Sequence, residues 1–77
     1  MIHQAKGYEV EITDATQWAT VYDADGRPAG TLQRRRVYEK GPRWTAYGLD
    51  GSKLIASNNA AIALRQVVDR AERAKNN

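Results

Sequence analysis

The sequence contains no cysteine and only one histidine, His3. Without cysteine, the chain can form neither disulfide bonds nor thiolate metal sites, and its absence fits a reducing compartment. His3 has no second histidine and no cysteine with which to share a metal ion. We therefore expect no metal site and no cofactor.

Long apolar runs are also absent. No stretch approaches the roughly 20 residues that a membrane-spanning helix needs, and the polar N-terminal segment 1–11 does not match a signal peptide. We expect one small cytoplasmic domain of 77 residues, flexible at 1–6 and 75–77, that has no membrane partner. A chain this short buries only about 60% of its unfolded surface, so it should be marginally stable unless it self-associates.

Patterns for catalysis are missing as well. Ser52 and Ser57 have no histidine that could activate them as nucleophiles. Asp23 and Asp25 flank an Asp-Gly turn, and turn chemistry explains them better than acid–base catalysis does. The glycines occur singly, without a phosphate-binding run. We therefore predict that the protein is not an enzyme and has no small-molecule substrate.

Alternation of apolar and polar residues predicts most of the strands. Tyr8, Val10 and Ile12 alternate with polar residues, which is typical of a strand with one buried face. Further strands are predicted over 17–23, 30–38, 43–48 and 53–56, separated by turn signals. Segments 18–27 and 44–53 half-repeat each other, each with an aromatic strand, an Asp-Gly turn and a basic residue. Two hairpins of one antiparallel meander would explain this half-repeat.

The spacing of apolar residues becomes helical from Ala60 onward, and Ser57 is the predicted N-cap. Ile62 points away from the apolar stripe, either as a solitary surface residue or as a contact for a partner. The predicted stripe consists of Ala60, Ala61, Leu64, Val67, Val68 and Ala71. The fold class is α+β: an antiparallel β-meander of about five strands with one C-terminal α-helix packed on one face. Its core should contain Val10, Ile12, Trp44 and either Trp18 or Val21.

Charge is distributed unevenly along the chain. The net charge is −4 over residues 1–26, +5 over residues 27–43 and +2 over residues 44–77. The basic charge of a domain with a pI of about 9.5 is thus concentrated in one segment. Such a local concentration of positive charge indicates an anionic partner more strongly than the total does.

The arginine run 34–36 lies in the predicted strand 30–38. Leu32 and Val37 fall on opposite faces of a regular strand, so a bulge within the arginine run is expected. Trp44 and Ala46 should face the helix. The open face would then carry the remaining side chains of strand 43–48 beside the arginines, namely Arg43, Thr45 and Tyr47.

These residues favour binding to nucleic acid, most of all duplex DNA. The guanidinium fork matches phosphate oxygens and the guanine edge, while tyrosine adds hydrogen bonds or stacking. The predicted contact residues are Arg34, Arg36, Arg43 and Tyr47. In the alternative interpretation the arginines protect an edge strand from aggregation.

A resemblance points the same way. Segments 36–38, 41–46, 50–53 and 59–61 resemble the AP2-type DNA-binding domain and the related arm-site-binding domains of phage integrases, over about residues 34–71. The resemblance implies three antiparallel strands followed by a helix, with DNA read by basic and aromatic side chains of the sheet. Three features depart from the pattern. Val37 follows Arg36 where the family has glycine, Ser57-Asn58-Asn59-Ala60 replaces the usual helix opening, and the first two predicted strands have no place in it.

The competing function is a protein-interaction module without a role on nucleic acid. Its basis is the small core, the acidic first hairpin beside a basic third strand, and the outward-pointing Ile62 as candidate interface. An acidic edge could meet the basic edge of a second copy in a homodimer, or the module could bind a different protein. A small accessory protein of a phage or mobile element fits either function.

Overall fold

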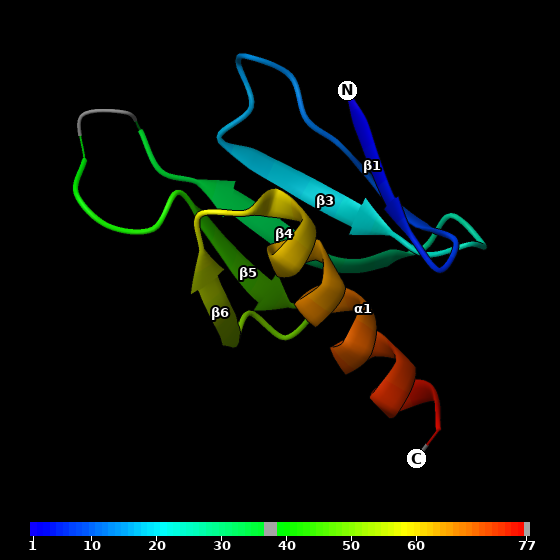
Figure 1. Cartoon of the computed structure of the whole chain (residues 1–77). Coiled ribbons are helices and arrows are strands. Elements are labelled where there is room, and N and C mark those ends of the chain that lie inside the picture. The colour runs from blue at the N-terminus through cyan, green and yellow to red at the C-terminus, as the bar shows by residue number, and fades with distance from the viewer. Residues whose placement is uncertain (37–38, 77) are drawn as a thin grey trace.

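The computed structural model describes residues 1–36 and 39–76 and has the predicted α+β class. Six strands form one antiparallel sheet in the order β1-β2-β3-β4-β5-β6, and one helix packs on it (Figure 1). The elements are β1 Ile2–Ala5, β2 Tyr8–Glu11, β3 Trp18–Tyr22, β4 Pro28–Arg34, β5 Trp44–Gly48, β6 Lys53–Ser57 and α1 Ala60–Lys75. Val37 and Tyr38, at the end of the predicted strand 30–38, and Asn77 lie outside the described residues.

Strand β1 is the one that the prediction of about five strands missed. It pairs with β2 along its whole length, from Ile2 opposite Glu11 to Ala5 opposite Tyr8. The connecting residues Lys6 and Gly7 have φ of 51° and 85°, and two consecutive positive φ values suit a tight hairpin turn. Lys-Gly is a weaker sequence signal for such a turn than Asn-Gly or Asp-Gly, which is why the hairpin was not predicted.

The core lies between the sheet and α1. Strand β2 buries Tyr8 and Val10, and Ile12 follows them inward, which confirms the predicted alternation. Trp44 and Ala46 also face the helix, as expected. In β3, Ala19 and Val21 are buried whereas Trp18 is exposed, which decides between the two predicted alternatives.

The buried stripe of α1 differs in part from the predicted one. Leu64, Val67 and Val68 are buried as expected, but Ala61 is exposed and Ala63 takes its place. Ala63 and Val67 are four residues apart, as are Leu64 and Val68, so the two pairs stack on one helical face. The exposed Ile62 confirms that this side chain points away from the sheet.

Gly30 allows α1 to lie close to β4. A Cβ atom at this position would lie 2.7 Å from Val67 Cγ1 and 2.6 Å from the carbonyl oxygen of Tyr47. Both distances are shorter than a carbon side chain tolerates, so only glycine permits this approach. Besides packing on β4, β5 and β6, α1 also contacts β1. The sheet therefore curls around the helix, and its other surface, hereafter the open face, is not covered by α1.

The helix begins at Ala60, as the spacing predicts, but its N-cap lies two residues later than predicted. Asn59, not Ser57, is the N-cap, and its Oδ1 accepts a hydrogen bond of 2.9 Å from the amide of Ala61. Ser57 Oγ instead accepts from the amide of Asn59, at 3.1 Å. Asparagine is as good an N-cap as serine, so the sequence did not discriminate between the two. Among the described residues, no helix is long and apolar enough to cross a membrane.

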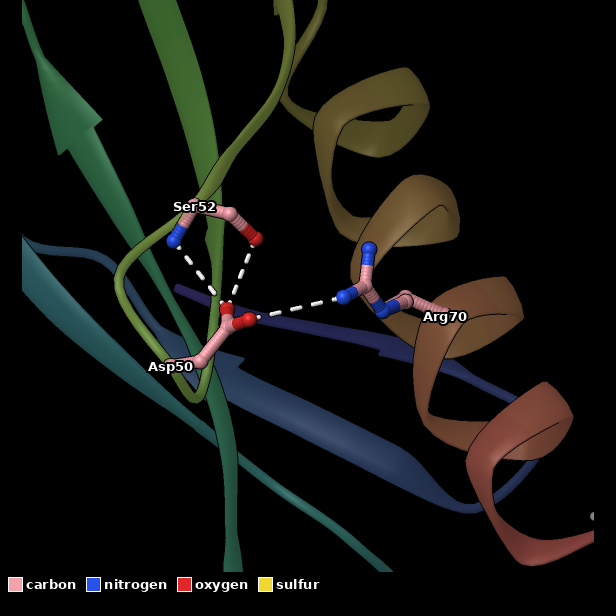
Figure 2. A network of polar contacts seen from close by, with 3 residues as sticks. All are labelled: Asp50, Ser52 and Arg70. Atoms are coloured by element: carbon pink, nitrogen blue, oxygen red, sulfur yellow. Dashed lines mark hydrogen bonds and ion pairs between the residues drawn. The ribbon is translucent and has the colours of Figure 1, made fainter.

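Two turns of the sheet are held against the C-terminal half of α1. In the β5–β6 turn, Asp50 Oδ1 accepts hydrogen bonds from the amide of Ser52 at 3.1 Å and from its hydroxyl at 2.7 Å. Asp50 Oδ2 lies 3.5 Å from Arg70 Nη2 of the helix (Figure 2). The hydrogen bonds from Ser52, and then the charge of Arg70, lower the pKa of Asp50 below its ordinary value of 3.8.

The β3–β4 turn is arranged in a similar way. Asp23 Oδ1 accepts hydrogen bonds of 2.9 Å from the amides of Asp25 and Arg27. The bond from Arg27 is the largest cause of the lowered pKa of Asp23, and the charge of Lys75 adds to it. Lys75 Nζ lies 3.9 Å from Asp23 Oδ2 and 5.3 Å from the centre of the Tyr8 ring. Lys75, in the segment expected to be flexible, is thus the last residue of α1 and contacts the sheet.

We predict that Leu64→Ala costs about 2–5 kcal/mol of unfolding free energy, because it leaves a cavity in a close-packed core. Leu64 is 1% exposed. Ile62→Ala is the matched control, since Ile62 lies two positions away on the same helix and is 45% exposed. Urea unfolding of the two variants measures the difference. Equal losses from both substitutions would contradict the packing of α1.

We also predict a loss of stability in acid through Asp23 and Asp50. The folded state lowers both pKa values below 3.8, so it favours the charged carboxylates. The resulting stabilisation is present above pH 3.8 and is lost as the pH falls through the lowered values. In the double variant Asp23→Asn/Asp50→Asn, the amide oxygens can still accept the backbone bonds, but they do not titrate.

Thermal unfolding midpoints measured across this acidic range should therefore fall less steeply for the double variant than for the wild type. The single variants should give intermediate slopes. Identical slopes for all proteins would show that the two turns do not contribute to acid sensitivity.

Candidate nucleic-acid interface

The arginine run begins where β4 ends. Strand β4 ends at Arg34. The amide of Arg34 donates a hydrogen bond of 2.7 Å to the carbonyl oxygen of Gln17, and the amide of Arg35 donates one of 2.7 Å to the carbonyl oxygen of Arg43. In the described part of the sheet, the register shifts lie at Val21/Tyr22 and Ala46/Tyr47. The bulge predicted within the arginine run is therefore wrong. The strand ends there instead, and the remaining arginines belong to a loop.

Arg34 lies on the helix side of the sheet, not on the open face beside Tyr47. It pairs with Trp44 across β4 and β5, and its guanidinium carbon is 5.7 Å from the centre of the Trp44 ring. Its Nη2 donates to the carbonyl oxygens of Thr13 at 3.1 Å and Asp14 at 2.6 Å. Arg34 thus attaches the loop that precedes β3 to the end of β4. Two oxygen partners from a distant segment fix the direction of its side chain.

Arg35 folds back over its own loop. Its Nε donates to the carbonyl oxygen of Pro42 at 3.1 Å, and its Nη1 lies 3.6 Å from Glu39 Oε2. Together with Gln33 and Glu39, Arg35 lines a small cavity of about 60 Å³ above Thr45. Thr45 is buried there on the open face, although it was expected to be exposed.

Three of the four predicted contact residues meet in one hollow. The side of the molecule where β4 ends and β3 begins has a hollow of about 370 Å³, lined by Arg34, Arg35, Arg36, Arg43 and residues 14–17. We call it the arginine hollow. Figure 1 shows the loop before β3 and the end of β4 at the same end of the sheet. Among the described residues, neither Arg34 nor Arg43 forms an ion pair with a carboxylate.

Tyr47, the fourth predicted residue, lies outside this hollow. It stands on the open face, where its ring is 5.8 Å from that of Trp18 at an angle of 34°. The Tyr47 hydroxyl donates to Gln33 Oε1 at 3.2 Å. Tyr47 therefore does not line the arginine hollow and instead forms an aromatic pair with Trp18 on the open face.

Trp18 is the residue that sequence reasoning missed. It is 59% exposed, whereas its counterpart in the half-repeat, Trp44, is buried. The signal was available, because the small or apolar Ala19 and Val21 alternate with Trp18, and only one of these two sets can face the helix. Trp18 directly follows Gln17, a residue of the arginine hollow, and lies opposite Gln33 at the same end of the sheet.

On its other side, Trp18 borders a groove that carries negative charge. This groove, of about 390 Å³, is lined by Ile2, Glu9, Glu11, Trp18, Thr20 and Tyr22, with Ala19 at its base. We call it the carboxylate groove. Among the described residues, β2 and β3 have one register pair, Glu9 opposite Tyr22, and both of these residues line the groove. The exposed part of β3 thus lies between a basic hollow and an acidic groove.

Comparisons of the chain with protein-family models, curated proteins and solved structures return no match. β4, β5, β6 and α1 follow one another in the order that the AP2-type resemblance implies, and the resemblance itself stays a prediction. In the described part of the chain, no three His, Cys, Asp or Glu side chains are placed to hold a metal ion. The site is interpreted from its own geometry.

Proposed function

We propose that the protein binds nucleic acid, with the arginine hollow as the site for its phosphates. The observation that carries the proposal is that four arginines line one hollow. Two of these arginines, Arg34 and Arg43, lack a carboxylate partner among the described residues. Positive charge that is not neutralised internally attracts an anion, and a guanidinium binds phosphate oxygens in a planar fork. Arg34, held by two carbonyl oxygens, needs little reorganisation when it binds.

The alternative interpretation of the arginines fails on topology. Arginines that prevent aggregation belong on the edge strands of a sheet. Strand β4 lies between β3 and β5, while the edges are β1 and β6. A protective role at an edge therefore does not explain Arg34. Binding of an external anion accounts for Arg34 and Arg43, which have no carboxylate partner among the described residues.

In this proposal the protein is a small accessory protein that acts on DNA, and duplex DNA is the partner that the sequence predicts. Support comes from the local positive charge, the open face with its aromatic side chains, and the order of strands and helix. Because the geometry of the hollow concerns phosphates, which all nucleic acids share, the first test uses both duplex and single-stranded probes.

The test compares two double variants with the same loss of charge. Arg36→Ala/Arg43→Ala removes two cations from the arginine hollow, and Arg65→Ala/Arg73→Ala removes two exposed cations from α1. If Arg36 and Arg43 each contact a phosphate, the slope of log K against log salt should flatten by about 2 units in the first variant. The control variant should keep nearly the wild-type slope.

Arg34 is left unchanged in this test because its replacement would also release the loop at Thr13 and Asp14. Lys75 is unsuitable as a control, since it contacts Asp23 and Tyr8. Fluorescence anisotropy over a range of salt concentrations measures the slopes. Absence of binding to any probe at low salt, where electrostatic attraction is strongest, would refute the proposal.

A second candidate function, a protein-interaction module, is favoured by Ile62. This large apolar side chain is 45% exposed on a helix whose other side is fully packed. Ile2 of the edge strand β1 and the preceding Met1 are also exposed. Exposed apolar residues of this kind suit a contact with a second copy of the chain or with a different protein.

We predict that, if Ile62 lies in a homodimer interface, the wild type sediments as two chains at micromolar concentration. Ile62→Glu should then sediment as a monomer, because the interface would have to bury an unpaired charge. Arg65→Glu, one turn further along α1, serves as a control for the added acid. A monomeric wild type at high protein concentration would exclude the homodimer.

A further inference from the structure

We infer that the nucleic acid is single-stranded, with its phosphates in the arginine hollow, a base stacked on Trp18 and the amino edge of that base turned to the carboxylate groove. This inference rests on the proposed function and adds the strandedness and base class of the ligand. It departs from duplex DNA, the partner that the sequence predicts, because of three features of the open face.

The first feature is the aromatic pair. Trp18 offers a large ring to solvent, and Tyr47 supports it from one side at 5.8 Å. Tyr47 is itself held by its hydrogen bond to Gln33. A supported, exposed indole is a stacking platform for an unpaired base, which contributes about 1–3 kcal/mol per base in single-strand binders. The bases of a duplex are already stacked on one another and cannot reach it.

The second feature is the position of Trp18. It begins β3 immediately after Gln17 and lies opposite Gln33 of β4, while Gln17 and Arg34 line the arginine hollow. Arg35 lines both this hollow and the small cavity beside Gln33 on the open face. A nucleotide carries its phosphate and its base on one sugar, so both must be bound within a short distance. Trp18 does not line the hollow itself, but it is one residue along β3 from the hollow's lining, which places the two sites at the same end of the sheet.

The third feature is the carboxylate groove. Glu9 and Glu11 lie on β2, two strands from β4, a separation of about 10 Å at the usual strand spacing. That distance is well within the Debye length of about 30 Å at 0.01 M salt, so at low salt their charge repels phosphates that approach Trp18 from their side. A duplex, with phosphates along both strands, would bring one strand towards these carboxylates.

A single strand can avoid this repulsion. Its phosphates can follow the arginines while its bases turn the other way, towards Glu9 and Glu11. Carboxylates accept hydrogen bonds from exocyclic amino groups, such as N4 of cytosine. Thymine has no exocyclic amino group, and its one ring donor, N3–H, lies between two carbonyl oxygens that carboxylates repel. The groove therefore favours cytosine and other amino-bearing bases over thymine.

The experiment measures the affinity of the folded protein for oligo(dC), oligo(dT) and a mixed duplex of equal phosphate number. We expect oligo(dC) to bind most tightly. Trp18→Ala should weaken single-strand binding by about 5- to 150-fold, the equivalent of one stacked base. Leu49→Ala is the matched control, since Leu49 is 71% exposed but belongs to the β5–β6 turn. Trp18→Phe, which keeps an aromatic ring, should retain much of the affinity.

Tryptophan fluorescence gives a second readout that does not depend on a truncated side chain. In the wild type, stacking of a base on the exposed Trp18 should quench the fluorescence of Trp18, while the fluorescence of the buried Trp44 should not change. The quench should disappear in Trp18→Phe. The variant Glu9→Gln/Glu11→Gln should bind both oligonucleotides more tightly at low salt and lose most of the preference for oligo(dC).

The outcomes separate this inference from the proposed function. If the duplex binds as tightly as the single strands, or if Trp18→Ala binds like the wild type, the single-strand inference is wrong while phosphate binding in the arginine hollow stands. If oligo(dT) matches oligo(dC), the role of the carboxylate groove is wrong. If no probe binds at low salt, the proposed function fails as well.

Discussion

The structure depends on one constraint: a single helix must provide the apolar cover for a six-stranded sheet. Leu64 and Val67 insert into the concave side of the sheet, and Gly30 lets the helix come close enough to do so. In the part of the chain that the structure describes, no second layer covers the other side. The open face therefore has no apolar cover among the described residues, and side chains such as Trp18 are exposed on it.

Two turns of the sheet lie against the C-terminal half of α1. Asp23 of the β3–β4 turn meets Lys75, and Asp50 of the β5–β6 turn meets Arg70. Exposed ion pairs of this kind contribute little to stability. Each Asp is also held by the amides of its own turn. The Asp-Gly step of the half-repeat aligns Asp25, not Asp23, with Asp50, so the two contacts with α1 do not follow from the repeat.

The alternation and spacing of apolar residues predicted the strands and the helix, because each of these elements buries one face. The alternation at Tyr8 and Val10, and the helical spacing around Leu64, were sufficient for strand, helix and core. Sequence did not predict where β4 ends or how Arg34 is directed, because its partners are carbonyl oxygens twenty residues away. Trp18 and Trp44 begin similar segments, but Trp18 alternates with Ala19 and Val21 whereas Trp44 shares its face with Ala46, a difference that the half-repeat obscured.

The order of charges along the chain becomes an order of charges in space. In a meander, consecutive strands lie side by side, so the acidic segment 1–26 and the basic segment 27–43 form neighbouring parts of one surface. Strand β3 lies between the acidic β2 and the arginines at the end of β4, and it presents Trp18 to solvent. A uniformly anionic ligand would be attracted on one side of this strand and repelled on the other. A ligand with anions along one edge and hydrogen-bond donors along the other satisfies both sides, and an unpaired polynucleotide strand has that arrangement.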